Sequence, residues 1–270
     1  YDETIVSVPT QLYDFAEAGL EIMKLSKYRT SIGEILICRV ADSGYVQIAG
    51  PVAISDTKSM CSEMFEMGCD LILIDGAIDR KSIASPETSD AIILATGAVL
   101  SRNLKKVVEE TAHIVGLYSL PELEMNQARK QIEENCNEEK IMLIKNGKLE
   151  KLDLKTGLGA SKFIDDAIDE DTEYVYIPGA FTNSVIADIH PLKLKSIKFV
   201  LKDPTKIFID SLTWTKMRKK GFQVNVLRNI EVAAVTVNPF APLGYSFEHG
   251  ALLEAMQKAL PDIPVIDVRV

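Results

Sequence analysis

The chain has 270 residues and a mass of 29.8 kDa, enough for one large α/β domain or two modest ones. Hydrophobic residues make up 47% and charged residues 26%, which excludes wholesale disorder. The net charge is −9, which argues against a dedicated nucleic-acid-binding protein because such a protein needs a surplus of cations. Apolar runs are far shorter than the roughly 20 residues of a membrane span, and the first residues lack a cationic signal start, so we expect a cytoplasmic protein without membrane contact.

Cysteine and histidine spacing gives no metal motif. The four cysteines form no C-x-x-C pair, and the three histidines are far apart in the sequence. We therefore expect reduced structural thiols, no zinc site and no tightly bound cofactor.

In the first half of the chain, segments with the spacing of apolar residues typical of helices alternate with segments that have the spacing typical of strands. Period-2 or continuous apolar runs predict strands, and apolar residues at three- and four-residue steps predict helices. Helices are predicted over 9–27, 56–67 and 104–117, and strands over 34–40, 45–50, 71–75 and 91–98.

The second half continues this alternation. A helix is predicted from Pro121 into the polar stretch 133–139, and a hairpin over 141–154 turns at Asn146-Gly147. Helices over 160–169, 210–220 and 249–260 then alternate with strands over 173–177, 197–201, 222–227, 232–237 and 264–270. The pattern predicts an α/β fold: one domain over residues 1–270, with a mainly parallel, doubly wound sheet and a small β-rich insertion or subdomain near 133–170.

Ligands of such sheets bind beyond the carboxyl ends of the strands, so residues after each apolar run are candidates. Asp75-Gly76 follows the apolar run 71–74, which is the Walker B arrangement of a strand that presents a carboxylate to Mg²⁺ beside a nucleotide phosphate. The structural alternative is an aspartate that ends a buried strand by chance.

Two more strand ends carry candidate residues. Thr96-Gly97 allows a ligand to approach the backbone, or simply forms a turn. Asn238 has an amide that can read an adenine edge, although the following Pro239 favours a turn. The lysines at 193, 195, 198, 202 and 206 are interpreted as the solvated side of a strand, with anion binding as the second interpretation.

A nucleoside triphosphatase of this layout also needs a phosphate-binding loop, G-x-x-x-x-G-K-[ST]. The chain contains no such string. The nearest stretch, 156–162, has its glycines too close together and its lysine after the serine, so a loop and helix start are predicted there.

Four segments resemble the small reactivase subunit of lysine 5,6-aminomutase and its relatives in amino-acid-fermenting bacteria. Their sequences are SIGE (31–34), GYVQIAGP (44–51), IDGAIDRKSIASP (74–86) and LATGA (94–98). The resemblance is clear over roughly residues 1–120. It implies a P-loop NTPase-like fold and a nucleotide-dependent chaperone that helps to replace inactivated corrinoid in an adenosylcobalamin-dependent aminomutase. The implied cofactors are ATP and Mg²⁺, and the implied partners are a larger reactivase subunit and the aminomutase.

The family's P-loop precedes the region matched here, so ATPase activity is expected only if such a loop lies upstream of residue 1. Within the resemblance, Asp75 would hold Mg²⁺, Gly76, Thr96, Gly97 and Asn238 would line the nucleotide site, and residues 76–86 would form a switch or partner loop. The candidate residues of that loop are Asp79, Arg80, Lys81, Ser82 and Ser85. The alternatives are a capped surface loop and, for the whole chain, a non-hydrolytic scaffold or docking subunit of a larger complex.

Overall fold

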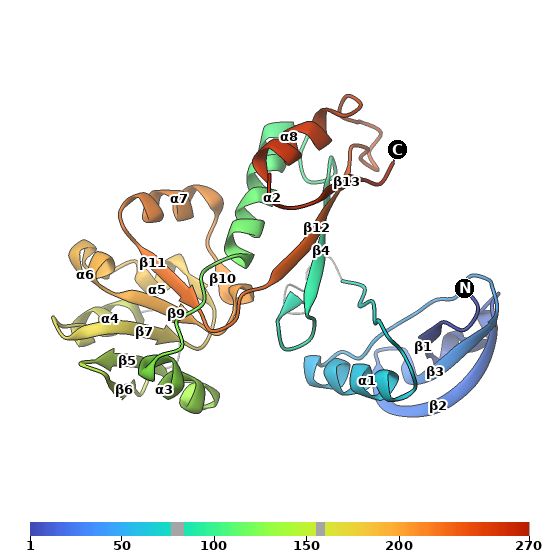
Figure 1. Cartoon of the computed structure of the whole chain (residues 1–270), viewed down its shortest axis with the longest axis horizontal. Helices are drawn as coiled ribbons and strands as arrows, with labels where there is room; N and C mark the ends of the chain where they lie inside the picture. Colours follow the sequence, from blue (N-terminus) through green and yellow to red (C-terminus); the bar gives the residue numbers. More distant parts are fainter. Residues whose placement is uncertain (77–83, 155–159, 270) are drawn as a thin grey trace. The chain divides into compact units, whose positions relative to one another are not determined.

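The computed structural model describes residues 1–76, 84–154 and 160–269. The contacts within the chain divide it into two compact units. Unit 1 holds Tyr1–Ile83 and Glu87–Ser89, and unit 2 holds Ala84–Pro86 and Asp90–Val270. Most of the helices and strands of each unit are labelled in Figure 1.

Unit 1 is a three-stranded antiparallel sheet packed against one helix. Its elements are β1 (Ile5–Pro9), the 3-10 helix η1 (Thr10–Phe15), β2 (Gly19–Thr30), β3 (Gly33–Asp42) and α1 (Ile54–Glu66), and its strand order is β1-β3-β2. Met60 and Met64 of α1 pack against Tyr28, Ile35 and Ile37 of the sheet. The predicted strand over 34–40 and the predicted helix over 56–67 are confirmed by β3 and α1.

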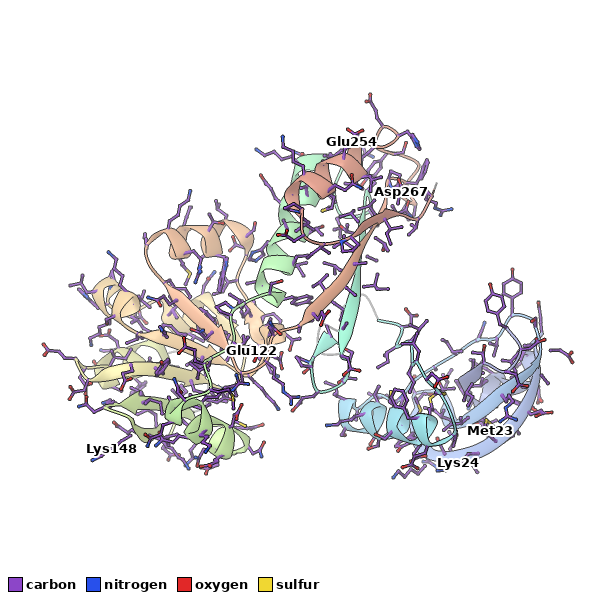
Figure 2. All side chains as sticks on the ribbon, in the orientation of Figure 1. Met23, Lys24, Glu122, Lys148, Glu254 and Asp267 are labelled. Carbon is purple, nitrogen blue, oxygen red and sulfur yellow. The ribbon has the colours of Figure 1, made fainter. Side chains whose placement is uncertain are left out.

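A polar network links β2 to α1 within this packing. The Tyr28 hydroxyl donates a hydrogen bond to Glu63 Oε1 at 2.7 Å, and Lys24 Nζ lies 2.7 Å from Glu63 Oε2. Figure 2 labels Lys24 among the side chains of unit 1. Burial and the hydrogen bond to Glu63 raise the pKa of Tyr28 to about 12, while hydrogen bonds from Lys24 and Tyr28 lower the pKa of Glu63. The helix and the sheet are thus joined by charge as well as by apolar contact.

The helix predicted over 9–27 is wrong. That segment forms the end of β1, η1 and most of β2, and Phe15, expected on the apolar helix face, is 79% exposed. In β2, buried Ser26 and Tyr28 alternate with exposed Leu25 and Lys27, which is the period of a strand. Pairing with β3 overrides the local helical pattern, because a strand gains its stability from its neighbours in the sheet.

The strand predicted over 45–50 is also wrong. This segment makes scattered backbone hydrogen bonds instead of a ladder, among them Ala49 N to Ser7 O at 3.1 Å and Glu17 N to Tyr45 O at 2.9 Å. Gly44 lies so close to Ala18 that a Cβ atom there would stand 2.6 Å from the Ala18 nitrogen. The close approach of two chain segments, and not a sheet, fixes this turn.

Unit 2 contains a five-stranded mixed sheet in the order β11-β9-β7-β5-β6. β5 (Ile141–Lys145) and β6 (Lys148–Leu152) form the predicted hairpin around Asn146-Gly147, and β5 also pairs antiparallel with β7 (Thr172–Ile177). β7, β9 (Lys198–Leu201) and β11 (Gln223–Val226) are parallel. The hairpin predicted over 141–154 is therefore part of this sheet.

Helices cover both faces of the five-stranded sheet. α3 (Gln127–Asn135) packs on Met142 and Ile144, whereas Ile141 and Leu143 point into the core on the opposite face. That second core includes residues of α4 (Ala160–Ala167), α5 (Asn183–Ile186) and α7 (Ser211–Lys219), and α6 (Pro191–Ser196) precedes β9 in the chain. The continuous apolar run of β5 is explained by burial on both faces.

The second sheet of unit 2 is parallel, with the order β13-β12-β4. Its strands are β4 (Ala91–Gly97), β12 (Glu231–Asn238) and β13 (Val265–Asp267). α2 (Leu104–Tyr118) and α8 (Ala251–Ala259) both lie on one face, where Val107, Val115, Leu252 and Met256 pack against Val235 (Figure 1). Two short strands, β8 (Phe181–Thr182) and β10 (Ile207–Phe208), form a separate parallel pair.

The prediction of one mainly parallel, doubly wound, P-loop-like sheet is wrong, although the α/β class holds. The strands are divided among an antiparallel sheet, a mixed sheet and two parallel sheets. Residues 71–75 form no strand: Leu71 is 75% and Leu73 82% exposed, and only Ile72 packs against the core of unit 1. A short apolar run does not specify its neighbours, so periodicity alone cannot tell which strands pair or in which direction.

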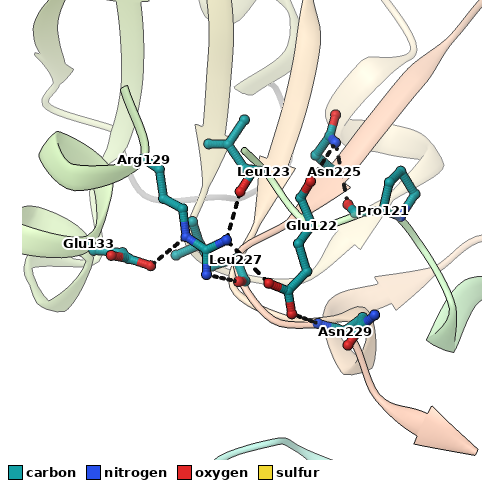
Figure 3. A network of polar contacts seen from close by, with 8 residues as sticks. All are labelled: Pro121, Glu122, Leu123, Arg129, Glu133, Asn225, Leu227 and Asn229. Carbon is teal, nitrogen blue, oxygen red and sulfur yellow. Dashed lines mark hydrogen bonds and ion pairs between the residues drawn. The ribbon is translucent and has the colours of Figure 1, made fainter. Parts of the chain in front are cut away.

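A buried arginine ties the five-stranded sheet to α3 (Figure 3). Arg129 Nε donates to Glu133 at 2.8 Å, Nη1 donates to the carbonyl of Leu123 at 2.6 Å and to Glu122 at 3.2 Å, and Nη2 donates to the carbonyl of Leu227 at 2.6 Å. Burial alone lowers the pKa of the Arg129 guanidinium, but hydrogen bonds to Glu133 and Glu122 outweigh it and raise that pKa. The guanidinium is thus satisfied by the protein, and its role is structural.

Candidate functional site

The carboxyl edge of the three-stranded parallel sheet is the place where the fold gathers most of the predicted nucleotide-site residues. β4 and β12 are paired so that Thr96 lies opposite Val237 and Gly97 opposite Asn238. Asp267 ends β13 in register with Val237 on the same edge. In parallel sheets this edge is where ligands bind, so a free polar group on any of these residues would be a candidate ligand contact.

Gly97 is needed by the neighbouring strand. A Cβ atom at this position would stand 2.3 Å from the carbonyl oxygen of Asn238, far inside van der Waals contact. The next residue, Ala98, donates its backbone N–H to the same carbonyl at 2.9 Å. The space beside Gly97 is therefore filled by protein backbone, which favours the structural interpretation of this glycine.

Asn238 forms a turn. Its Oδ1 accepts a hydrogen bond from the backbone N–H of Phe240 at 3.0 Å, an arrangement typical of an asparagine that initiates a turn before proline. The side-chain oxygen that would accept from the adenine amino group is thus engaged within the protein.

The Thr96 hydroxyl points into the helix-covered face of the sheet. It lies 2.7 Å from the Thr111 hydroxyl of α2, which in turn donates to the Val107 carbonyl at 2.8 Å. Both threonines are buried. Thr96 therefore contributes to the packing of α2 and offers no free hydroxyl at the edge.

Arg102 and Tyr245 stand at this edge, and the sequence reasoning missed both. The Tyr245 hydroxyl donates to the Ala98 carbonyl, and the Arg102 guanidinium lies 4.9 Å from the centre of the Tyr245 ring. Arg102 is exposed, so the edge presents one cation held over an aromatic ring. The only sequence signal for Arg102 was its position five residues beyond Gly97.

Asp75 and Gly76 belong to unit 1 and are both exposed. They follow an irregular segment, so no strand presents the Asp75 carboxylate. Across the described part of the chain, no group of three or more His, Cys, Asp or Glu side chains is placed to hold a metal ion. Asp75 thus supplies one solvated carboxylate, and the premise that it ends a buried strand is wrong.

Only one candidate residue of the predicted switch loop can be placed. Asp79, Arg80, Lys81 and Ser82 lie outside the described residues, as does the glycine-containing stretch 156–159. Ser85 is buried and donates its hydroxyl to Asp203 Oδ2 at 3.2 Å.

Asp203 anchors this part of unit 2. Its Oδ1 accepts from the backbone N–H of Thr205 at 2.9 Å and from the Thr205 hydroxyl. Burial, and then the Asp203 carboxylate, raise the pKa of Tyr118. The carboxyl end of the resembling segment 74–86 is therefore fixed to the body of unit 2 by a buried hydrogen bond.

Comparison of the chain with protein-family models, curated proteins and solved structures finds no match. Within the described residues, none of the helices combines the length and the apolar character needed to cross a bilayer.

Proposed function

We propose that this chain is an accessory factor that takes part in reactivating an adenosylcobalamin-dependent amino-acid aminomutase, together with a larger reactivase subunit. The proposal rests on the four segments that resemble the small reactivase subunit. That resemblance is the observation that carries the proposal. In three of the segments a residue is also held by close contact: a Cβ at Gly44 or Gly97 would meet the backbone of Ala18 or Asn238, and the Ser85 hydroxyl donates to Asp203. The resemblance therefore falls on positions where a substitution would disturb the fold.

ATP and Mg²⁺ are implied by the resemblance, but the described residues do not fit a complete nucleotide site. Mg²⁺ in such sites is held by one or two carboxylates together with the nucleotide phosphates, and the phosphates need a loop of backbone amides and a lysine. Asp75 supplies a single exposed carboxylate, and Thr96 and Asn238 use their side-chain oxygens within the protein. Nucleotide binding at Asp75 stays a prediction.

Docking without hydrolysis is the second candidate function, and a specific feature favours it. On the face of the parallel sheet opposite α2 and α8, Ile93 is 63% and Ile266 52% exposed. Thr236 pairs with Ile266 on one side and with Ala95, two residues after Ile93, on the other. Parallel sheets are normally covered on both faces. An exposed apolar face of this kind is typical of a surface that binds another protein.

Reactivation is the direct test of the first function. The chain, the larger reactivase subunit and an aminomutase that has lost activity through corrinoid damage are mixed with fresh adenosylcobalamin, ATP and Mg²⁺. We expect aminomutase activity to return only when the chain is present. No return of activity with the complete mixture would refute the proposed function.

Two sets of variants separate the nucleotide-dependent form from the docking form. If Asp75 holds Mg²⁺, Asp75→Asn abolishes ATP-dependent reactivation, whereas Asp70→Asn, at an equally exposed carboxylate nearby, leaves it unchanged. If the chain only docks, Asp75→Asn is silent, and Ile93→Glu weakens binding to the larger subunit at least about tenfold by placing a charge in an apolar contact. Phe163→Glu is the matched control, since Phe163 is 58% exposed but lies on α4 of the other sheet.

A further inference from the structure

Residues 191–228 concentrate positive charge in an otherwise acidic chain. This segment contains ten lysines and arginines against two aspartates, although the whole chain has a net charge of −9. The spacing of its first lysines indicates the solvated side of a strand. In the structure, Lys193, Lys195 and Lys198 lie before or at the start of β9, and Lys202 and Lys206 lie after its end. Lys195 and Lys198 lie at the same edge of the sheet as the cations of α7.

The fold brings six of the cations to one edge of the five-stranded sheet. α6 ends just before β9 and α7 just before β11, and these two strands are parallel neighbours with Lys198 opposite Gln223. Lys195 of α6 packs beside Gly221, which follows α7: a Cβ at Gly221 would stand 3.5 Å from Lys195 Cγ. We name this group the basic edge, and its members are Lys195, Lys198, Lys216, Arg218, Lys219 and Lys220.

The charges of the basic edge are not neutralised within the described chain. All six side chains are exposed, and none forms an ion pair with an acidic residue among those the structure describes. Lys198 Nζ lies 5.9 Å from the centre of the Tyr174 ring, and Arg218 donates to the Phe222 carbonyl at 3.2 Å.

Two of the acidic residues near the start of the neighbouring strand β7 are bound elsewhere, whereas Glu170 and Asp171, just before the strand, are exposed. Asp169 pairs with Lys145 at 2.9 Å, and Glu173 accepts the Gly147 backbone N–H at 3.1 Å. Both contacts lie on the side of the hairpin β5–β6. Asp169 and Glu173 therefore do not neutralise the cations of the basic edge.

Stabilisation of helix ends does not account for this group. Cations near a helix carboxyl terminus interact favourably with the helix dipole, and Lys216, Arg218 and Lys219 lie in the last turn of α7. Lys195 likewise lies in the last turn of α6, and Lys220 is the C-cap of α7. Helix-end stabilisation does not explain the full set, because Lys198 lies in β9.

We infer that the basic edge is a docking surface for a carboxylate-rich, acidic segment of a partner protein. Charge complementarity steers such an encounter and fixes its orientation. Five of the six cations are lysines, whose hydrated point charges suit diffuse, salt-dependent contact with several carboxylates. The inference goes beyond the proposed function, since it requires neither a nucleotide nor an aminomutase.

Nucleic-acid partners fit this surface less well than an acidic peptide. Single-stranded nucleic acid needs exposed rings for stacking, but Trp214 and Phe222 beside the cluster are buried.

The test is binding of a fluorescein-labelled oligoglutamate peptide to the whole chain, measured by fluorescence anisotropy at about 50 mM salt, where screening is incomplete. We expect saturable binding that weakens as salt is raised. The triple variant K195E/K219E/K220E should weaken it by at least about tenfold, and the neutral variant K195Q/K219Q/K220Q by an intermediate factor. The variant K105E/K106E/K258E makes the same change in net charge elsewhere on exposed helices and should bind the peptide within about twofold of the parent chain.

Three results would overturn the inference. The first is no peptide binding by a parent chain whose circular dichroism shows it to be folded. The second is an equal loss in the basic-edge and control variants, since that would reflect net charge alone. The third is tighter binding of an oligouridine RNA, or of phosphatidylserine vesicles, than of the peptide, which would identify a nucleic-acid or membrane surface instead.

Discussion

Gly97→Ala tests whether the carboxyl edge of the parallel sheet is closed by its own backbone. Gly97 does not have a positive φ angle, so alanine meets no intrinsic backbone strain there, and the cost comes from contact alone. The new methyl group would stand 2.3 Å from the Asn238 carbonyl oxygen, and moving that oxygen away strains the hydrogen bond from Ala98, now 2.9 Å long. Overpacking of this kind costs about 1–3 kcal/mol and a lost hydrogen bond about 1 kcal/mol, so we expect unit 2 to lose about 2–4 kcal/mol of unfolding free energy.

Urea denaturation measures this change. The single tryptophan, Trp214, lies buried in unit 2, so its fluorescence reports that unit, and far-ultraviolet circular dichroism follows the whole chain. Gly116→Ala is the matched control: a Cβ there meets nothing within 4 Å, and it lies inside α2, where alanine gains up to about 1 kcal/mol. If Gly97→Ala were as stable as the parent chain, the glycine would not be required for packing, and a space for a ligand beside it would become the better explanation.

The remaining predictions concern the two polar networks. Arg129→Met should lower the unfolding free energy of unit 2 by about 3–5 kcal/mol, because the carbonyl groups of Leu123 and Leu227 lose their hydrogen-bond donor. Urea denaturation measures this loss, and a value below about 1 kcal/mol would contradict the structural role of the guanidinium. The pKa of Tyr28 is raised to about 12 in the folded state, so its contribution to stability is complete below pH 10 and is lost as the pH rises towards 12; Tyr28→Phe should flatten this alkaline decline in thermal denaturation. The pKa of Glu63 is lowered in the folded state, so stability is lost as the pH falls through that lowered value, and Glu63→Gln should remove this acid-side loss.

Local signals in the sequence predicted several elements correctly. The hairpin at Asn146-Gly147 is confirmed, and both residues have the positive φ angles, 48° and 72°, that this dipeptide adopts in tight hairpin turns. The helix over 104–117 is confirmed as α2, whose Asn103 cap accepts a hydrogen bond from the Lys106 backbone. Such features depend on a few neighbouring residues, which is why the sequence alone indicates them.

The wrong predictions share one cause: residues distant in the sequence determine the conformation of these segments. The segment 9–27 has apolar residues at helical spacing, yet β3 draws most of it into a sheet. The segment 71–75 has the composition of a buried strand, yet it pairs with no described strand. The candidate site changed for the same reason, since Gly97, Thr96 and Asn238 meet their partners only through strand pairing and helix packing.

By itself the sequence determined the α/β class, most helices of the second half and the conformation of its clearest turn, because propensity, periodicity and turn chemistry act over a few residues. Only the tertiary structure decided the direction of strand pairing, the burial of Ser85 on Asp203 and the gathering of six cations at one edge of a sheet. These depend on contacts between distant residues, whose free energy is gained only when the whole unit folds.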